Sequence, residues 1–205
     1  MQLSSKTALV TGGTDGIGAE LIRQLRDKGV TVITQGRNPD RVAATRSAGF
    51  EVFAADLSTP GGIKILTEAV AGLKIDILVN NAGAGVDHDF RDAPPDLEAA
   101  DSAIFLNLDA PIHLIAALML MLQSRPEAMI VNVTSGLAIA PRAGGPVYCA
   151  TKAGLRSYTQ ALRAQLKDTR IHVLEALPPT PARRAAAACA DTNPPRACPT
   201  TGVAR

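Results

Sequence analysis

Tyr148 and Lys152 are the two residues in this sequence whose types and spacing most directly suggest chemistry. They stand four positions apart, and the pattern that follows is helical, with apolar residues at Leu155, Tyr158, Leu162 and Leu166. Positions i and i+4 of a helix share one face, so the phenol and the ammonium should point the same way. An ammonium beside a tyrosine favours its phenolate, which makes a useful general acid and base. A chance pair on a helix surface is the competing interpretation, and the surrounding sequence has to decide between the two.

A glycine-rich turn near the N-terminus predicts an anion site. Thr7 to Val10 reads as a buried strand, and a helical pattern runs from about Gly18 to Lys28. Between them lie Gly12, Gly16 and Gly18. Backbone N–H groups of such a turn, together with the helix dipole, favour a phosphate, and the missing side chains admit a pyrophosphate. A tight turn without a ligand is the alternative for this motif taken alone.

Arg37 follows the second predicted strand, Val30 to Thr34, and bears on cofactor choice. In dinucleotide sites an acidic residue near this point holds the ribose 2′-hydroxyl, whereas an arginine suits a 2′-phosphate. No Asp or Glu lies between Val30 and Pro39, which favours NADP(H) over NAD(H). Asp15 in the glycine turn argues the other way, because it would repel a nearby phosphate, and an ordinary surface role for Arg37 stays open.

Strands and helices alternate along the first 180 residues. Further strands are predicted at Glu51 to Ala54, Ile75 to Val79, Ala128 to Val133 and Ile171 to Leu177, with helices at about 40–47, 60–72, 96–123 and 148–167. This order predicts an α/β fold with a six-stranded, doubly wound parallel sheet. Ligands of such sheets bind at the carboxyl ends of the strands. The polar or glycine residues that follow strand ends are Gly12, Arg37, Asp56, Asn80 and Ser135.

The helical pattern from Asp96 to Gln123 contains Pro111, which predicts a kink or a break. Its apolar face, with Ile112, Ile115, Met119 and Leu122, is predicted to pack in the core. A subunit interface is the second interpretation of so wide an apolar face.

Composition excludes several classes of function. The net charge is +2, of which residues 181–205 carry +3 (four Arg and one Asp), leaving 2 − 3 = −1 on residues 1–180, so nucleic acid is not expected as a partner. The three cysteines lack metal-ligand spacing, the three histidines are scattered, and no metal site is expected. An odd cysteine count and the absence of a signal-peptide core favour the cytoplasm. The longest apolar stretch, around Leu114 to Leu122, falls short of the ~20 residues of a membrane helix.

Taken together, these motifs resemble the short-chain dehydrogenase/reductase family of NAD(P)-binding Rossmann proteins over about residues 5 to 180. The resemblance rests on residues in the family's order and spacing: Thr11-Gly12, Gly16-Ile17-Gly18, Asp56, Asn80-Asn81-Ala82-Gly83, Asn107, Ser135 and Tyr148 with Lys152. The resemblance implies an oxidoreductase that acts on a small carbonyl or alcohol substrate. It also implies that the protein assembles as a dimer or tetramer. A bacterial oxidoreductase subgroup linked with D-alanine esterification is similar in the segments from Ser135 and from Pro146.

The resemblance also implies roles for individual residues. Tyr148 donates the proton, Ser135 holds the substrate oxygen, Lys152 activates Tyr148 and binds the nicotinamide ribose, and Asn107 holds a water. Asp56 contacts adenine and Asn80 lies along the cofactor. The full cofactor-binding set that it implies is Gly12, Thr14, Asp15, Gly16, Ile17, Gly18, Arg37, Asp56, Leu57, Asn80, Ala82, Gly83, Tyr148, Lys152 and Pro178.

The C-terminal segment departs from the family pattern. After Pro178-Pro179 the family has Val or Ile and then Thr, where this chain has Pro181 and Arg183. Residues 181–205 contain eight Ala, four Pro and four Arg, and are predicted to be a disordered tail on a Rossmann domain of residues 1–180, without a seventh strand. A truncated dinucleotide-binding module with little or no catalytic activity is therefore the rival to an active enzyme.

Overall fold

The chain forms a single parallel sheet with helices on both faces. The computed structural model describes residues 1–91, 94 and 96–178. The strands are β1 (Thr7–Thr11), β2 (Thr31–Gly36), β3 (Glu51–Ala54), β4 (Ile77–Asn80), β5 (Ala128–Val133) and β6 (Ile171–Ala176). All neighbours pair in parallel, in the order β3-β2-β1-β4-β5-β6. The predicted α/β class and the six predicted strands are confirmed, whereas the predicted tail, residues 181–205, lies outside the described residues.

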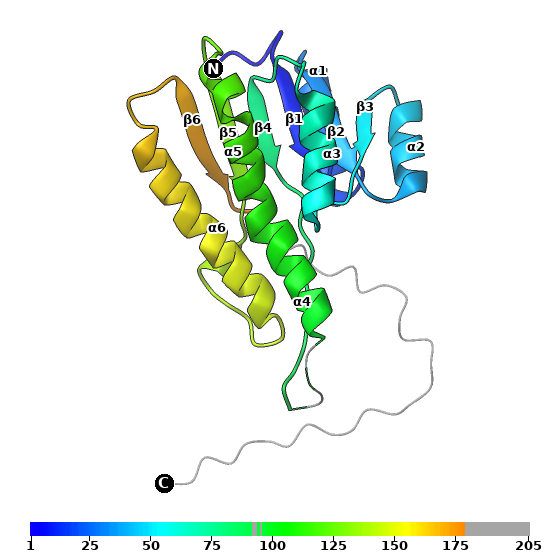
Figure 1. The fold of residues 1–205 in the computed structure, drawn as a ribbon, viewed down its shortest axis with the longest axis vertical. Helices are drawn as coiled ribbons and strands as arrows, with labels where there is room; N and C mark the ends of the chain where they lie inside the picture. The colour runs from blue at the N-terminus through cyan, green and yellow to red at the C-terminus, as the bar shows by residue number, and fades with distance from the viewer. Residues whose placement is uncertain (92–93, 95, 179–205) are drawn as a thin grey trace.

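Helices cover the two faces of the sheet unequally. The α-helices are α1 (Gly16–Asp27), α2 (Pro39–Ser47), α3 (Pro60–Val70), α4 (Leu97–Ile104), α5 (Ala110–Gln123) and α6 (Pro146–Gln165); η1 (Phe105–Asp109) is a π-helix and η2 (Gly136–Ala138) a 3-10 turn. Figure 1 shows α3, α5 and α6 side by side in front of the sheet, with α1 behind it. The carboxyl ends of β1, β2, β4 and β5 therefore meet at one edge, where a ligand can reach them.

Alternation along the strands divides the core into two layers. Leu9, Leu78 and Ile130 point to the face covered by α3, α5 and α6. Ala8, Val10, Ile77 and Val79 point to the opposite face, where Ile22 of α1 packs on them. Each central strand is thus buried on both sides, which is why these strands read as continuous apolar runs.

The segment from Leu97 to Gln123 is helical without interruption, so of the kink or break predicted at Pro111 the break does not occur. Instead the helix passes through η1, whose register leaves Ala110 N–H bonded to the Phe105 carbonyl five residues earlier. Pro111 has no N–H to donate to the Asn107 carbonyl, and the wider π turn lets the helix continue past that gap.

This helical segment has the length that the sequence predicted, but its apolar part extends beyond the predicted stretch around Leu114 to Leu122. It is the one described helix whose length and composition would suffice to cross a membrane, with a mean hydropathy of 1.8. Six residues of α5 are buried against the sheet and its neighbours, so much of that apolarity serves the core: Ala110, Pro111, Leu114, Ile115, Leu118 and Leu122.

Candidate active site

The glycine turn between β1 and α1 is held in place by polar side chains of β2. Thr34 Oγ1 accepts a hydrogen bond from Gly13 N–H at 3.1 Å and donates one to the Val10 carbonyl at 2.6 Å. Gln35 Oε1 accepts one from Gly12 N–H at 3.1 Å. Both side chains are buried in the sheet, at 0% and 4% exposed, so the turn stands on a rigid base.

The turn leaves room for a ligand that side chains would block. Gly12 has φ +68°, and a Cβ there would lie 2.9 Å from Ala82 Cα. A Cβ at Gly18 would lie 2.2 Å from the Gly12 carbonyl oxygen, so only glycine lets α1 begin this close to the turn. Gly16 at φ +52° faces open space, with no atom within 4 Å of a Cβ. A backbone bare of side chains at the N-terminus of a helix, whose dipole favours negative charge, is a place where a pyrophosphate can bind.

Asn81 joins the loop after β4 to this turn. Its Nδ2 donates to the carbonyls of Thr11 at 3.0 Å and Gly12 at 3.3 Å, and Thr11 Oγ1 accepts from Asn81 N–H at 3.0 Å. Asn80 points elsewhere: its Nδ2 donates to Asn132 Oδ1 at 2.8 Å beneath α6, and only 3% of it is exposed. Asn81, not Asn80, therefore lines the cavity described below.

Two arginine–carboxylate pairs stand at the β2 end of the site. Arg41 Nη1 lies 2.6 Å from Asp15 Oδ2, and Arg37 Nη1 lies 3.7 Å from Asp56 Oδ2. Partial burial opposes ionisation of Asp56, but hydrogen bonds from the Ser58 N–H and hydroxyl outweigh it and lower the pKa of Asp56. Both carboxylates that would repel a phosphate are thus matched by an adjacent guanidinium.

Ser135, Tyr148 and Lys152 come together at the other end. Ser135 follows β5, and its Oγ accepts a hydrogen bond from Leu137 N–H at 3.2 Å. Tyr148 and Lys152 lie in the first two turns of α6, with Lys152 Nζ 5.7 Å from the centroid of the Tyr148 ring. Lys152 Nζ donates to the Val133 carbonyl at 2.9 Å. Burial lowers the pKa of Lys152 to about 8.

Asn107 lies behind this group. It is fully buried in η1, and its side chain accepts from Ala84 N–H at 2.9 Å and donates to the Ala84 carbonyl at 2.8 Å. It also donates to Thr151 Oγ1 of α6 at 3.2 Å. The side chain therefore ties the loop after β4 to α6, and the water-holding role stays a prediction.

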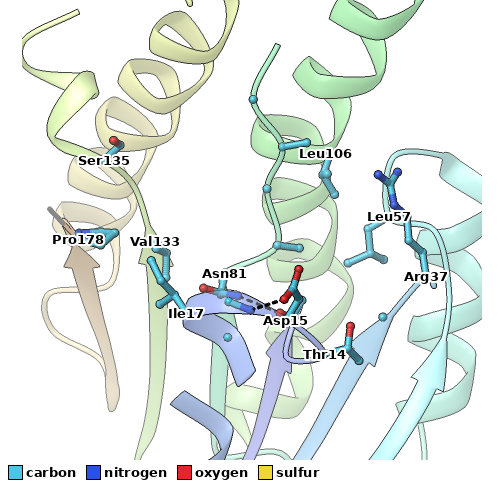
Figure 2. A pocket seen from close by; sticks show the side chains of 18 of the residues that line it. Thr14, Asp15, Ile17, Arg37, Leu57, Asn81, Leu106, Val133, Ser135 and Pro178 are labelled. Carbon is cyan, nitrogen blue, oxygen red and sulfur yellow. Dashed lines mark hydrogen bonds between the residues drawn. The ribbon is translucent and has the colours of Figure 1, made fainter. Parts of the chain in front are cut away.

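A cavity of about 810 Å³ runs along this edge of the sheet. Figure 2 shows Ser135 and Pro178 at one end of it, and Arg37 with Leu57 at the other. Every residue proposed from the sequence lines it except Asn80 and Asn107. Ten further lining residues were not among the predicted site residues: Gln35, Gly36, Arg41, Asn81, Ala84, Gly85, Leu106, Val133, Leu137 and Arg142. In the described part of the chain, no group of three or more His, Cys, Asp or Glu could hold a metal ion.

The residues present fit a dinucleotide. The paired arginines stand at one end of the cavity, the glycine turn follows, and the buried Lys152, bonded to Val133, stands towards the other end. Adenosine ribose, pyrophosphate and nicotinamide follow one another in the same order in a dinucleotide. Gly83 brings the loop after β4 close to the buried lysine, since a Cβ there would lie 3.3 Å from Lys152 Nζ and 3.0 Å from Asn107 Oδ1.

Comparison with known proteins agrees with this fit. Residues 6–188 match the family model described as short chain dehydrogenase. The chain is 40% identical over 185 residues to the uncharacterized oxidoreductase DltE of Bacillus subtilis, covering 87% of this chain and 73% of that protein. It is 30% identical over 189 residues to an NADP-dependent 3-hydroxy acid dehydrogenase of Schizosaccharomyces pombe, covering 86% and 72%.

Solved structures share the architecture. L-sorbose reductase of Gluconobacter frateurii, crystallised with NADPH and L-sorbose, superposes with a TM-score of 0.76 at 28% identity, covering 85% of this chain and 70% of that one. A bulky-bulky ketone specific alcohol dehydrogenase of Comamonas testosteroni gives 0.77 at 29% identity, covering 85% and 72%. With a family match over most of its length, a parallel six-stranded sheet and a cavity lined by the glycine turn, Tyr148 and Lys152, this chain belongs to the short chain dehydrogenases, a family of NAD(P)-dependent oxidoreductases.

Proposed function

We propose that the chain transfers a hydride between NADP(H) and a small carbonyl or alcohol substrate. One observation carries the proposal. Ser135, Tyr148 and Lys152 line the same cavity as the glycine turn, and Figure 2 shows Ser135 at the opposite end from Arg37. A reacting carbonyl placed beside the first two would lie within reach of a nicotinamide whose phosphates rest on the turn.

The side chains at the catalytic end divide the work of a carbonyl reduction. Bound NADPH supplies the hydride. Ser135 Oγ already accepts a hydrogen bond from Leu137 N–H, so its own hydrogen remains to be donated to the substrate oxygen. Tyr148 donates the proton to that oxygen, and Lys152 stabilises the phenolate that remains. Asn107 acts as a positioning residue, because its side chain fixes Ala84 and Thr151 on either side of the group.

Two arginines support a preference for NADP(H). Arg37 and Arg41 both line the β2 end of the cavity, and each is more than half exposed. A 2′-phosphate there could take two charge-assisted contacts in exchange for exposed ion pairs that contribute little. The names of the fission-yeast relative and of the L-sorbose reductase structure, NADP-dependent and NADPH-bound, point in the same direction.

The substrate must be small enough for the space between the β4 loop and η2. The substrates in the names of similar proteins are a 3-hydroxy acid, L-sorbose and bulky ketones. A shared fold and shared catalytic residues therefore do not identify the substrate of this chain. The similarity to DltE carries the same limit, since that protein is itself an uncharacterized oxidoreductase.

We further propose a homo-oligomer in the cytoplasm. The outward side of α5 carries no Asp, Glu, Lys or Arg between Ala110 and Gln123, and Leu120 on it is 81% exposed. Helix faces depleted of charge are typical of subunit interfaces. Cys149, a free buried thiol, suits a reducing compartment.

The test combines cofactor binding with turnover. Nicotinamide fluorescence should report NADPH binding to the purified protein, and a panel of ketones and aldehydes should oxidise the bound NADPH. Tyr148→Phe should abolish turnover, by a factor of about a thousand or more, while NADPH affinity changes little, because the phenol acts mainly in the transition state. Cooperative melting should be retained in this variant. NADPH binding without turnover of any carbonyl would instead support the non-catalytic dinucleotide-binding module.

A further inference from the structure

Arg142 places a positive charge at the catalytic end of the cavity. It belongs to the irregular segment between η2 and α6, and it lines the cavity together with Ser135 and Tyr148. The carboxylates among the described lining residues are Asp15 and Asp56, which come from the glycine turn and the end of β3. Each of those has its own arginine, so the charged residues that line the cavity beside Ser135 and Tyr148 are Lys152 and Arg142, the latter paired with Asp87 outside the lining.

The structure fixes the position of this guanidinium. Arg142 N–H donates to Cys149 Sγ at 3.4 Å, and the Arg142 carbonyl accepts from Gly145 N–H at 3.4 Å. The side chain lies over Gly145, where a Cβ would come within 3.1 Å of Nη2 and 3.2 Å of Nε. Because Gly145 has no side chain, the guanidinium can pack directly on the backbone just before α6. The N-terminal N–H groups of α6 add to the positive potential there.

Asp87 holds the outer side of the guanidinium. Arg142 Nη2 hydrogen-bonds to Asp87 Oδ1, from the loop after β4, and Asp87 does not line the cavity. No other described side chain bonds to the guanidinium, so Nε and Nη1 keep donors for a second acceptor. The hydrogen bond and charge of Asp87 raise the pKa of Arg142, which therefore stays charged at this end of the cavity.

These features are those of a carboxylate receptor beside the reacting group. A guanidinium offers its donors as a planar fork that fits a carboxylate through two parallel bonds. An ion pair as exposed as that of Arg142 and Asp87, at 42% and 44%, contributes little by itself, so a second carboxylate can share or displace Asp87. The charge-matched partner for this end of the cavity is therefore an anionic substrate rather than a neutral ketone.

We propose that Arg142 binds a carboxylate of the substrate, which makes the substrate class small oxo acids and the corresponding hydroxy acids. This inference rests on the proposed oxidoreductase function. In the reduction the hydride of NADPH reaches the carbonyl carbon, Tyr148 gives its proton to the carbonyl oxygen, and NADP⁺ and a hydroxy acid are formed. The carboxylate is unchanged; Arg142 orients it so that the carbonyl faces Ser135 and Tyr148, while Asp87 positions Arg142.

The experiment compares acids with their neutral esters. Pyruvate, acetoacetate and levulinate are each paired with the methyl ester, and kcat/KM is measured with NADPH for the full chain. At least one acid should exceed its ester by tenfold or more. In Arg142→Gln that acid-to-ester ratio should fall by tenfold or more, chiefly through KM, and Arg142→Lys should lose less because it keeps the charge without the fork. Arg23→Gln is the matched control, since it removes an ion-paired arginine of α1 outside the cavity, and should leave the ratio unchanged.

Each other result has a defined meaning. Esters reduced as well as their acids, or a ratio that Arg142→Gln leaves intact, would overturn the inference while the oxidoreductase function stands. Reduction of neither class, with no other carbonyl reduced, would overturn the function itself. Calorimetric binding of the same oxo acids to NADP⁺-loaded protein then decides the inference separately: absent binding, or equal binding by the wild type and Arg142→Gln, overturns it.

Discussion

Lys152 carries a buried charge that links the chemistry of the site to the stability of the fold. It is 3% exposed, and burial lowers its pKa from 10.5 to about 8. Below a pH of about 8 the lysine is protonated in both folded and unfolded protein, so the full cost of the buried charge is present. Between the two pKa values the unfolded chain binds more protons, and stability therefore rises with pH.

The prediction is a pH dependence that one substitution removes. Relative to Lys152→Met, the free energy of unfolding of the wild type without cofactor should rise by about 2 kcal/mol from a pH of about 7.5 to about 9.5. Urea denaturation across this range measures it, and subtraction of the variant cancels other titrating groups. Lys64→Met is the control, because Lys64 on α3 is 74% exposed. The free energy of unfolding of the wild type relative to this variant should not rise over the same pH range. A flat difference for Lys152→Met would contradict the lowered pKa.

Arg41 bears on cofactor choice through Asp15. Its removal deletes one cation and leaves the Asp15 carboxylate unpaired beside the phosphate cradle. Arg41→Gln should therefore weaken NADPH binding by about tenfold and NADH binding by much less, as titrations of nicotinamide fluorescence would show. Arg26→Gln, whose guanidinium stacks on Phe50 outside the cavity, is the control. Equal losses for both cofactors would mean that Arg41 does not meet the 2′-phosphate.

Residue positions were predicted well where one element carries two functional groups. The i, i+4 spacing of Tyr148 and Lys152 places them on one side of α6, and both line the cavity. Asn80 and Asn81 show the limit, because successive strand residues face opposite ways and a shift of one residue decides the direction. Asn80 pairs in register with Asn132 below α6, while Asn81 already lies in the loop. Arg142 lies in an irregular segment, where no periodicity indicates which side chains point inward.

Among the elements, the first turn of α3 packs against the backbone of Asp56, which lines the cavity. Gly61 and Gly62 are adjacent in its first turn, yet their surroundings differ. A Cβ at Gly62 would lie 1.8 Å from the Asp56 carbonyl oxygen, whereas at Gly61 the nearest atom is Thr59 Oγ1 at 3.9 Å. The backbone of the cavity-lining Asp56 therefore rests directly on the helix.

This contrast predicts opposite effects of the same substitution. Gly62→Ala should destabilise the protein by about 1–3 kcal/mol, since backbone rather than a flexible side chain must move. It should also weaken cofactor binding through the displaced Asp56. Gly61→Ala should cost nothing and can add up to about 1 kcal/mol through helix propensity. Urea denaturation of both variants, with NADPH titration, makes the comparison, and similar melting of the two would refute the close contact.

Local sequence signals predicted where the strands begin and end, but they did not predict that the helix continues through Pro111. Apolar runs bounded by glycine, asparagine or aspartate located all six strands to within about two residues. Pro111 indicated a kink or a break because proline lacks an N–H, and the π-helix η1 just before it keeps the helix unbroken. Such a register change depends on packing against α6 and the sheet, which no local pattern records.

At the scale of the whole molecule, the distribution of exposed apolar side chains is uneven. His113, Ala116, Ala117 and Leu120 form an exposed stripe along α5, spaced by three or four residues and free of formal charge. Leu97 and Ile104 extend exposed apolar surface along the same helical segment, at 67% and 37% exposed. Apolar side chains gathered on an exposed surface are a recognised mark of an interaction site.

The proposed homo-oligomer should therefore depend on α5. In a symmetric dimer each substitution acts twice, so Leu120→Glu should raise the dissociation constant roughly a hundredfold or more, from the burial lost by two leucines. Sedimentation or mass photometry at micromolar concentration measures the shift. Ile65→Glu, on α3 and 54% exposed in the wild type, is the control and should leave assembly intact. A wild-type monomer at such concentrations would refute the oligomer, and an assembly that Leu120→Glu leaves unchanged would locate its interface away from α5.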